Sequence, residues 1–176
     1  MDFERILFTE EDILNKVKEL GKKITEDNQG EDLVVIGILR GAFIFMSDIV
    51  RHIDTPVKID FFSLSSYGQS SNSSGVVKIR KDIDTDITGK NVIVVEDIVD
   101  TGLTLNYIKD YLEKHNPKSV KLCTLLDKPK AHKADIKIDY LGFEIENHFV
   151  VGYGLDYAEN YRNLPYIAIL KKEIYS

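Results

Sequence analysis

Three carboxylate side chains, Glu96, Asp97 and Asp100, lie within five residues of one another. The small-residue turn Thr101–Thr104 follows them directly. Carboxylates can accept hydrogen bonds from sugar hydroxyls, bind Mg²⁺ or abstract a proton. A small-residue turn that opens a helix offers free N–H groups to a phosphate. Together these residues indicate a site for a ribose that carries a 5-phosphate and a metal-bound pyrophosphate.

The element before this motif agrees with a ligand site. Val92–Val95 is a β-branched run without polar alternation, which is typical of a parallel strand buried on both faces. In open α/β sheets, ligands bind beyond the carboxyl ends of the strands. The structural alternative is a strand that ends in solvated acids, followed by a helix with Asp100 or Thr101 as its N-cap. The density of the motif favours the ligand site.

A second apolar run has the same organisation. Leu33–Leu39 predicts another buried strand, and Arg40 and Gly41 follow it before a predicted helix. Two strands therefore present loops at the same edge of the sheet. From the local sequence alone, Arg40 is as consistent with a surface charge after a strand as with a residue that binds an anion.

The remaining pattern is that of an α/β protein. Thr9 precedes three acids and predicts the start of a helix whose apolar residues run at helical spacing to Ile24. Another helix continues from Leu105 and ends at Asn116–Pro117. Further strands are predicted at Val57–Leu64, Val76–Ile79, Val120–Leu126, Tyr140–Ile145, His148–Gly152 and Tyr166–Leu170. We expect a central parallel twisted sheet flanked by helices, with a small hood made from the C-terminal segments and the N-terminal helix.

Length and composition bound the class of protein. The 176 residues suit a single domain, with its core at about residues 30–145. The net charge of −6 gives no general attraction for nucleic acid or anionic membranes, so neither is expected as a partner. One cysteine, Cys123, excludes an internal disulfide and agrees with a reducing compartment. The first residues have neither a basic nor an apolar leader pattern, so we expect a cytoplasmic protein.

The segment from Ser65 to Gly75 is polar and rich in Gly and Ser, so it predicts a mobile loop. One interpretation is a plain hairpin loop. The other is a lid that closes over a reacting centre and excludes water.

The motif Glu96–Thr104 resembles the phosphoribosyl-pyrophosphate signature of the type I phosphoribosyltransferases. Leu125–Lys128 and Phe149–Tyr157 are similar to the purine-binding segments of the 6-oxopurine branch of that family. The match runs from about Gly37 to Arg162. It implies Mg²⁺-dependent purine salvage, in which the 5-phosphoribosyl group of phosphoribosyl pyrophosphate moves to N9 of hypoxanthine or guanine. The products would be IMP or GMP and diphosphate, and the family implies a homodimer or homotetramer.

The resemblance also implies roles for individual residues. The ribose and its 5-phosphate would be bound by Glu96, Asp97, Ile98, Val99, Asp100, Thr101, Gly102, Leu103, Thr104 and Leu105. The diphosphate would be bound by Arg40, Gly41 and Arg162, and Mg²⁺ by Glu96, Asp97 and Asp156. The purine would be bound by Lys128, Phe149, Val150 and Asp156, and Ser66 and Tyr67 would open a flexible catalytic loop.

Two of these residues would take part in the chemistry. Asp100 would be the general base or acid at purine N7, and Lys128 would select a 6-oxo over a 6-amino group. Two positions depart from the family pattern, since many members have Lys in place of Arg40 and some have Lys in place of Leu103. In that family, the loop that contains Arg40 binds pyrophosphate mainly through its backbone, so Arg in place of Lys agrees with the same role. The loop also often has a non-proline cis peptide bond.

Two alternatives stay open. The first is a regulatory protein on the same fold that binds nucleotides, with RNA or DNA, and without turnover. The net charge and the presence of Asp100 and Lys128 speak against it. The second is an enzyme of the same family for xanthine, which depends on contacts to the purine 2-position, or for a pyrimidine, which the segments around Lys128 and Phe149 disfavour.

Overall fold

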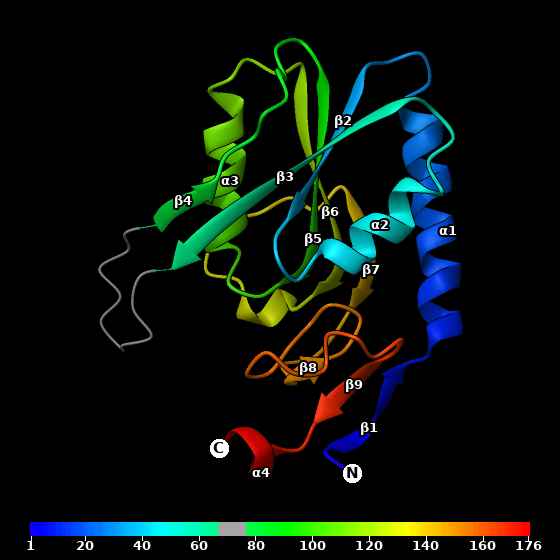
Figure 1. The fold of residues 1–176 in the computed structure, drawn as a ribbon, viewed down its shortest axis with the longest axis vertical. Coiled ribbons are helices and arrows are strands. Elements are labelled where there is room, and N and C mark those ends of the chain that lie inside the picture. Colours follow the sequence, from blue (N-terminus) through cyan, green and yellow to red (C-terminus); the bar gives the residue numbers. More distant parts are fainter. Residues whose placement is uncertain (67–76) are drawn as a thin grey trace.

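The protein forms two sheets, seen here in a computed structural model that describes residues 1–66 and 77–176 (Figure 1). The larger sheet contains β2 (Leu33–Ile38), β3 (Val57–Ser66), β4 (Val77–Lys81), β5 (Asn91–Val99), β6 (Ser119–Asp127) and β7 (Tyr140–Glu144). The smaller sheet contains β1 (Phe3–Phe8), β8 (Val150–Val151) and β9 (Ile167–Leu170). The helices are α1 (Glu10–Asp27), α2 (Phe43–Val50), α3 (Leu103–Glu113), the 3₁₀ turn η1 (Pro129–Ala131) and α4 (Lys172–Tyr175).

The larger sheet has the order β4-β3-β2-β5-β6-β7. All of its neighbouring strands are parallel except β3 and β4, which are antiparallel. The predicted central α/β sheet is therefore confirmed, and it is mixed because β3 and β4 form an antiparallel pair at one edge. A parallel connection needs a crossover of about a dozen residues or more, usually a helix, and residues 67–76 are too short for one.

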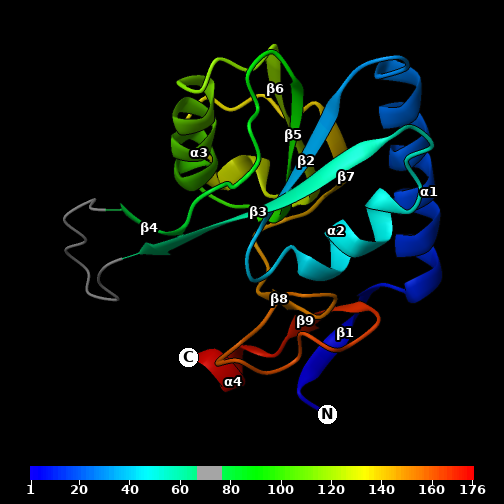
Figure 2. The same ribbon diagram turned by 45° about the horizontal axis from the view of Figure 1, so that its top comes forward.

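Helices cover both faces of the larger sheet, as Figures 1 and 2 show. Leu33 and Val35 of β2 pack in one buried cluster with α1 and α2. Val34 and Ile36, which point to the opposite face, pack in a second cluster with α3. Alternate residues of one strand thus enter two cores, which explains why the central strands are apolar at every position. In the described residues, no helix is long and apolar enough to cross a membrane.

The hood is the smaller sheet β1-β9-β8. We expected the N-terminal helix to join it, but the N-terminal contribution is strand β1, which pairs antiparallel with β9. Helix α1 packs instead against α2 and β7, because its apolar residues belong to the core of the larger sheet. A capping box at Thr9 marks the boundary between β1 and α1. The Thr9 hydroxyl accepts from the Asp12 N–H, and the Asp12 carboxylate accepts from the Thr9 N–H.

The register of the parallel strands brings their loops together. Gly37 of β2 lies opposite Val95 of β5, and Val95 lies opposite Cys123 of β6. The chain therefore leaves these three strands at one edge of the sheet, and the hood lies beside that edge in both views (Figures 1 and 2). The loops after β2, β5 and β6 face it, as the general position of ligand sites in α/β sheets predicts.

Asp60 is a buried carboxylate in β3 that holds the connection leading to β5. Its Oδ1 accepts from the Phe61 N–H at 2.7 Å, and its Oδ2 accepts from the N–H groups of Asp84 and Thr85 at 2.8 Å each. Lys81 Nζ lies 3.3 Å from Oδ1. Burial alone would raise the pKa of Asp60, but the backbone N–H donors outweigh it and lower the pKa to about 2.

We predict that Asp60→Asn lowers the free energy of unfolding at pH 7 by about 1–3 kcal/mol, because an amide cannot accept all of these hydrogen bonds. The pKa of an unfolded aspartate is about 4, so the stabilisation by the wild-type carboxylate is present above that pH and is lost as the pH falls toward 2. Urea unfolding at several pH values measures both effects. Asp110→Asn, at an exposed position of α3, is the control. An equal acid-induced loss of stability in wild type and Asp60→Asn would contradict this assignment.

Candidate active site

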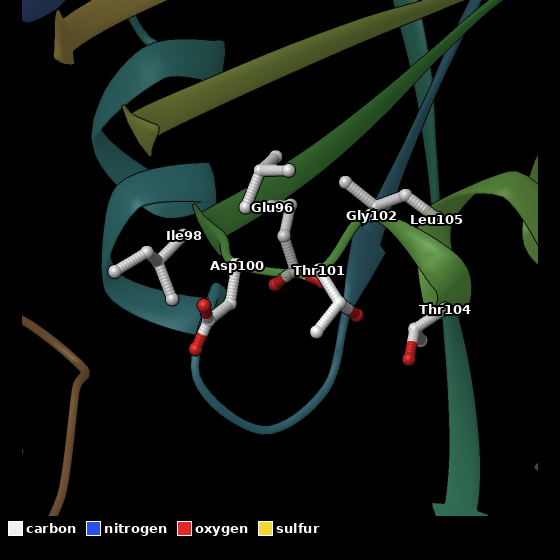
Figure 3. Close-up of a pocket in the computed structure, with 8 residues that line it drawn as sticks. Glu96, Ile98, Asp100, Thr101, Gly102, Thr104 and Leu105 are labelled. Carbon is white, nitrogen blue, oxygen red and sulfur yellow. The ribbon is translucent and has the colours of Figure 1, made fainter. Parts of the chain in front are cut away.

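The acidic motif and the turn after it enclose a cavity of about 160 Å³, which we call the loop cavity (Figure 3). It is lined by Glu96, Ile98, Val99, Asp100, Thr101, Gly102, Thr104 and Leu105. Figure 3 shows the side chains of Asp100, Thr101 and Thr104 around the turn between β5 and α3. All eight lining residues were predicted to bind the ribose and its phosphate. Two predicted residues of this stretch do not line the loop cavity: Asp97, which packs against Gly41, and Leu103, which begins α3 and is 54% exposed.

Gly102 makes this turn possible. Its φ of +80° lies in the left-handed region, which favours glycine, and it forms the N-cap of α3 without a side chain to cap the helix. The Leu103 N–H donates to the Thr101 hydroxyl at 3.3 Å, and because Gly102 has no side chain to cap the helix, the following N–H groups of the first turn can face a ligand. The Thr101 carbonyl accepts from the N–H groups of Lys133 at 2.8 Å and Ala134 at 3.3 Å, so the segment after η1 holds the turn in place.

Glu96 and Asp97 form a half-buried pair of adjacent acids at the end of β5. Burial raises the pKa of Glu96 well above its usual value, and the neighbouring charge of Asp97 raises it further. Burial also raises the pKa of Asp97, against the opposing effects of hydrogen bonds from Glu96 and the Ile98 N–H and of the Arg162 charge. Two acids that are costly to ionise are stabilised by hydroxyl donors or by a divalent cation.

The predicted metal ligands are not gathered into one cluster. In residues 1–66 and 77–176, no three His, Cys, Asp or Glu side chains lie close enough together to hold a metal ion. Asp156 is engaged by other groups, since its Oδ2 accepts from the Glu159 N–H at 2.9 Å and its Oδ1 lies 3.2 Å from Arg162 Nη2. Mg²⁺ is commonly held by one or two carboxylates together with waters and substrate phosphates, and the pair Glu96 and Asp97 fits that pattern.

Three chain segments pack in direct contact here: the turn at Gly154 contacts the loop at Gly41, and Gly41 contacts Asp97 of β5. A Cβ atom at Gly41 would overlap Asp97 Oδ2, and a Cβ atom at Gly154 would overlap the Gly41 carbonyl oxygen. Gly154 also has a φ of +99°. The peptide bond between Leu39 and Arg40 is cis, in the loop for which the resemblance implies such a bond. These glycines let the loop after β2 lie directly against the acids of β5.

A second cavity, which we call the arginine cavity, has a volume of about 380 Å³ and is lined by Leu39, Arg40, Phe43, Glu159 and Arg162. It brings together Arg40 and Arg162, two of the residues predicted to bind diphosphate. Arg162 Nη1 donates to the Gly154 carbonyl at 2.6 Å. Its Nε is buried and has no hydrogen-bond partner among the described residues, so this donor remains available for an anionic ligand.

A third cavity, the base cavity, has a volume of about 200 Å³ and lies between β6 and the hood. Its lining is Ile98, Asp100, Lys128, Phe149, Val150, Leu155 and Asp156. It therefore unites all four residues predicted to bind the purine. Lys128 is only 8% exposed, and its N–H donates to the Val99 carbonyl at 2.9 Å, which ties the end of β6 to the end of β5.

Phe149 already has aromatic neighbours. Its ring stacks on Tyr175 of α4, with centroids 4.7 Å apart, and meets Tyr157 edge to face at 5.6 Å. One face of the Phe149 ring is thus covered by the C-terminal helix, and stacking on a purine would use the other face.

The predicted loop residues fall at the edge of the described structure. Ser66 is the last residue of β3, opposite Val77 of β4. Tyr67 lies outside the described residues.

Two interactions near the site were not predicted from the sequence. His132 Nε2 lies 2.6 Å from Oδ1 of the buried Asp127, the residue before Lys128. Glu159 makes a two-point ion pair with Arg40 across the arginine cavity. A His or Glu in a polar segment gives no signal of such a partner, because the partner is fixed by the meeting of loops that are distant in sequence. The proximity of Asp127 and His132, five residues apart, is the one clue that the sequence offered.

Comparison with known proteins identifies related chains. The family model described as phosphoribosyl transferase domain matches residues 6–158. The chain is 53% identical over 174 residues to a hypoxanthine-guanine phosphoribosyltransferase of Bacillus subtilis (strain 168), covering 99% of this chain and 97% of the relative. A Streptococcus agalactiae protein of the same name is 52% identical over 175 residues, with the same coverage.

Solved structures agree with these relatives. A hypoxanthine phosphoribosyltransferase from Staphylococcus aureus matches with a TM-score of 0.96 and 51% identity, covering 99% of this chain and 95% of that chain. A hypoxanthine-guanine phosphoribosyltransferase from Bacillus anthracis, solved with a HEPES molecule in its active site, matches with a TM-score of 0.92 and 53% identity, covering 96% and 99%.

We predict that Asp97→Asn raises the free energy of unfolding by about 1 kcal/mol at pH 8 in metal-free buffer, because it removes one of two adjacent half-buried charges. The folded-state pKa values of Glu96 and Asp97 are raised. Wild type therefore loses stability as the pH rises from the unfolded pKa of about 4 through those values, and the variant loses less. Asn keeps an oxygen to accept from the Ile98 N–H. Urea unfolding at pH 5 and pH 8 tests this, and a variant less stable than wild type at pH 8 would disprove it.

Proposed function

The chain belongs to the phosphoribosyltransferase family, and we propose that it carries out the purine-salvage reaction for which its curated relatives are named. It transfers the 5-phosphoribosyl group of phosphoribosyl pyrophosphate to N9 of hypoxanthine and of guanine. The products are IMP or GMP and diphosphate. The relatives cover nearly the whole chain at about half identity, so the enzyme class rests on the full length of the protein.

One observation carries the proposed site: Asp100 and Ile98 line both the loop cavity and the base cavity. A ligand with a phosphate in the first cavity and a purine in the second would place its ribose beside Asp100. The arginine cavity has a lining of its own, and Arg40 of that lining precedes Gly41, which packs against Asp97. A nucleotide and a diphosphate thus have separate places that meet at the carboxylates of β5.

In this arrangement the loop cavity binds the phosphoribosyl group. The backbone N–H groups of Thr101, Gly102 and Thr104 hold the 5-phosphate at the start of α3. Glu96 and Asp97 accept hydrogen bonds from the ribose 2- and 3-hydroxyls, which offsets the cost of their burial.

The base cavity orients and selects the purine. The Lys128 ammonium donates to the 6-oxo group, and an adenine would present a donor to this donor. Phe149 covers the ring and the backbone at Val150 meets the base edge. Asp100 holds or accepts the proton at purine N7, which adjusts the charge of the base as N9 attacks C1 of the ribose.

The leaving group, diphosphate, binds in the arginine cavity. Arg40, the backbone at Gly41 and Arg162 bind the diphosphate, and the free Nε of Arg162 is one of its donors. The acid pair and Asp156 are the residues that would hold Mg²⁺. When bound, this ion neutralises diphosphate charge as the C1–O bond breaks.

Some features of the whole protein belong to the same proposal. We propose a single domain over residues 1–176, with a core at about residues 30–145 and a hood that carries part of the base cavity. We also propose a homodimer or homotetramer in the cytoplasm, without nucleic acid or membrane partners.

We predict that the protein, assayed with phosphoribosyl pyrophosphate and Mg²⁺, turns over hypoxanthine and guanine, and that turnover needs Mg²⁺. Asp100→Ala should lower kcat by about 10²–10⁴-fold, the usual contribution of a general acid or base. Removal of Mg²⁺ with EDTA should abolish turnover, and Asp110→Ala on the exposed face of α3 is the control. Tight nucleotide binding without turnover of any base would favour the regulatory alternative. Preferential turnover of xanthine would favour the second alternative.

We predict that Lys128→Gln narrows the preference for hypoxanthine over adenine by about tenfold or more. A glutamine amide can donate to a 6-oxo group or accept from a 6-amino group, whereas an ammonium can only donate. The ratio of kcat/KM for the two bases measures the change. Lys130→Gln, in the exposed turn η1, is the matched control, and an unchanged ratio in Lys128→Gln would remove Lys128 from base selection.

A further inference from the structure

The side chain of Glu159 lines the arginine cavity, where an anionic ligand would bind. Its carboxylate takes both terminal nitrogens of Arg40, with Nη2 to Oε1 at 2.8 Å and Nη1 to Oε2 at 2.7 Å. The two residues are 119 positions apart in sequence and come from different loops. This two-point geometry is the one that an Arg side chain forms with a phosphate group.

The backbone directs Glu159 toward this position. The Glu159 N–H donates to Asp156 Oδ2 at 2.9 Å. Ala158, Glu159 and Tyr161 have φ values of 49°, 66° and 79°, in the left-handed region that non-glycine residues seldom adopt. The turn is thus held in an unfavourable conformation that places a carboxylate between two guanidinium groups.

The second arginine shares the same carboxylate. Arg162 Nη2 lies 3.9 Å from Glu159 Oε1, while Arg162 Nε is buried without a partner among the described residues. Arg162 Nη2 lies closer to Asp156 Oδ1, at 3.2 Å, so Glu159 is the main acid partner of Arg40 and a second, more distant one of Arg162.

We infer that Glu159 is an internal counter-anion that competes with diphosphate for Arg40 and Arg162, and so sets the affinity of the enzyme for the diphosphate end of its substrate and for its product. This inference rests on the proposed function. When a diphosphate binds, Arg40 leaves Glu159 for the phosphate oxygens. Without a ligand, Glu159 offsets the repulsion between the two guanidinium groups.

The exposure of the pair sets how strongly it competes. The Arg40 and Glu159 side chains are 67% and 61% exposed, and ion pairs in such surroundings contribute little to stability. A diphosphate carries several charges and can take bidentate hydrogen bonds from both arginines, so it displaces the carboxylate. The effect of Glu159 on diphosphate affinity is therefore a moderate one.

The test compares Glu159→Gln with wild type by titration calorimetry of inorganic diphosphate in the presence of Mg²⁺. The variant should bind diphosphate about 3- to 10-fold more tightly, with a lower KM for phosphoribosyl pyrophosphate and an unchanged KM for hypoxanthine. Glu31→Gln is the matched control. This change also removes a carboxylate that accepts from one cation through both oxygens, since Lys118 Nζ lies 3.0 Å from Glu31 Oε1 and 2.9 Å from Oε2. Glu31 lines none of the three cavities.

A second comparison asks whether the effect passes through Arg40. In an Arg40→Met background, the further change Glu159→Gln should alter diphosphate affinity by less than it does in wild type, because the guanidinium group for which Glu159 and diphosphate compete is gone. A role of Glu159 confined to the fold of its turn would give the same change in both backgrounds, and that result would overturn the inference.

The outcomes separate this inference from the proposed function. If wild type turns over hypoxanthine but Glu159→Gln binds diphosphate equally or more weakly, the competition by Glu159 is refuted and the enzyme assignment stands. If wild type neither binds diphosphate nor turns over any purine, both fall together.

Discussion

The whole site depends on a close approach of three chain segments at Asp97. The loop after β2, the end of β5 and the turn after β8 pack so closely that a Cβ atom at Gly41 would overlap Asp97, and one at Gly154 would overlap Gly41. Parallel register brings the first two segments to the same edge, and the hood brings the third. Because sequence neighbours of these three residues line the three cavities, a shift of any one segment would alter the separation of the places proposed for phosphate, base and diphosphate.

The same contact has an electrostatic cost. Burial raises the pKa of both Glu96 and Asp97, which means that the folded protein keeps two acids in an environment that disfavours their charge. Arg162 offsets part of this cost for Asp97. Natural proteins commonly keep such destabilised groups where a ligand later satisfies them. The acid pair is therefore better understood from its ligand than from the stability of the fold.

Much of this could be predicted from the sequence, since the informative signals are local. The apolar runs of β2 and β5 and the acids after Val95 are contiguous, so periodicity and spacing reveal them. Strand β1 was missed because it is a short strand in a small, partly exposed sheet whose partner lies at the other end of the chain. The antiparallel pairing of β4 with β3 agrees with the hairpin interpretation of the segment that joins them. The pair Arg40 and Glu159 could not be found, because it depends on where two distant loops meet.

The pairing of β1 with β9 joins the two ends of the chain in one sheet, and β8 pairs with β9 in turn. Val150 of β8 and Phe149 line the base cavity, and Tyr175 of α4 stacks on Phe149. During synthesis on a ribosome, the loop cavity can therefore close as soon as β5, α3 and the segment after η1 have emerged. The base cavity also needs Phe149, β8 and β9, which come later in the chain, so a nascent chain acquires the residues that line the loop cavity before those that line the base cavity.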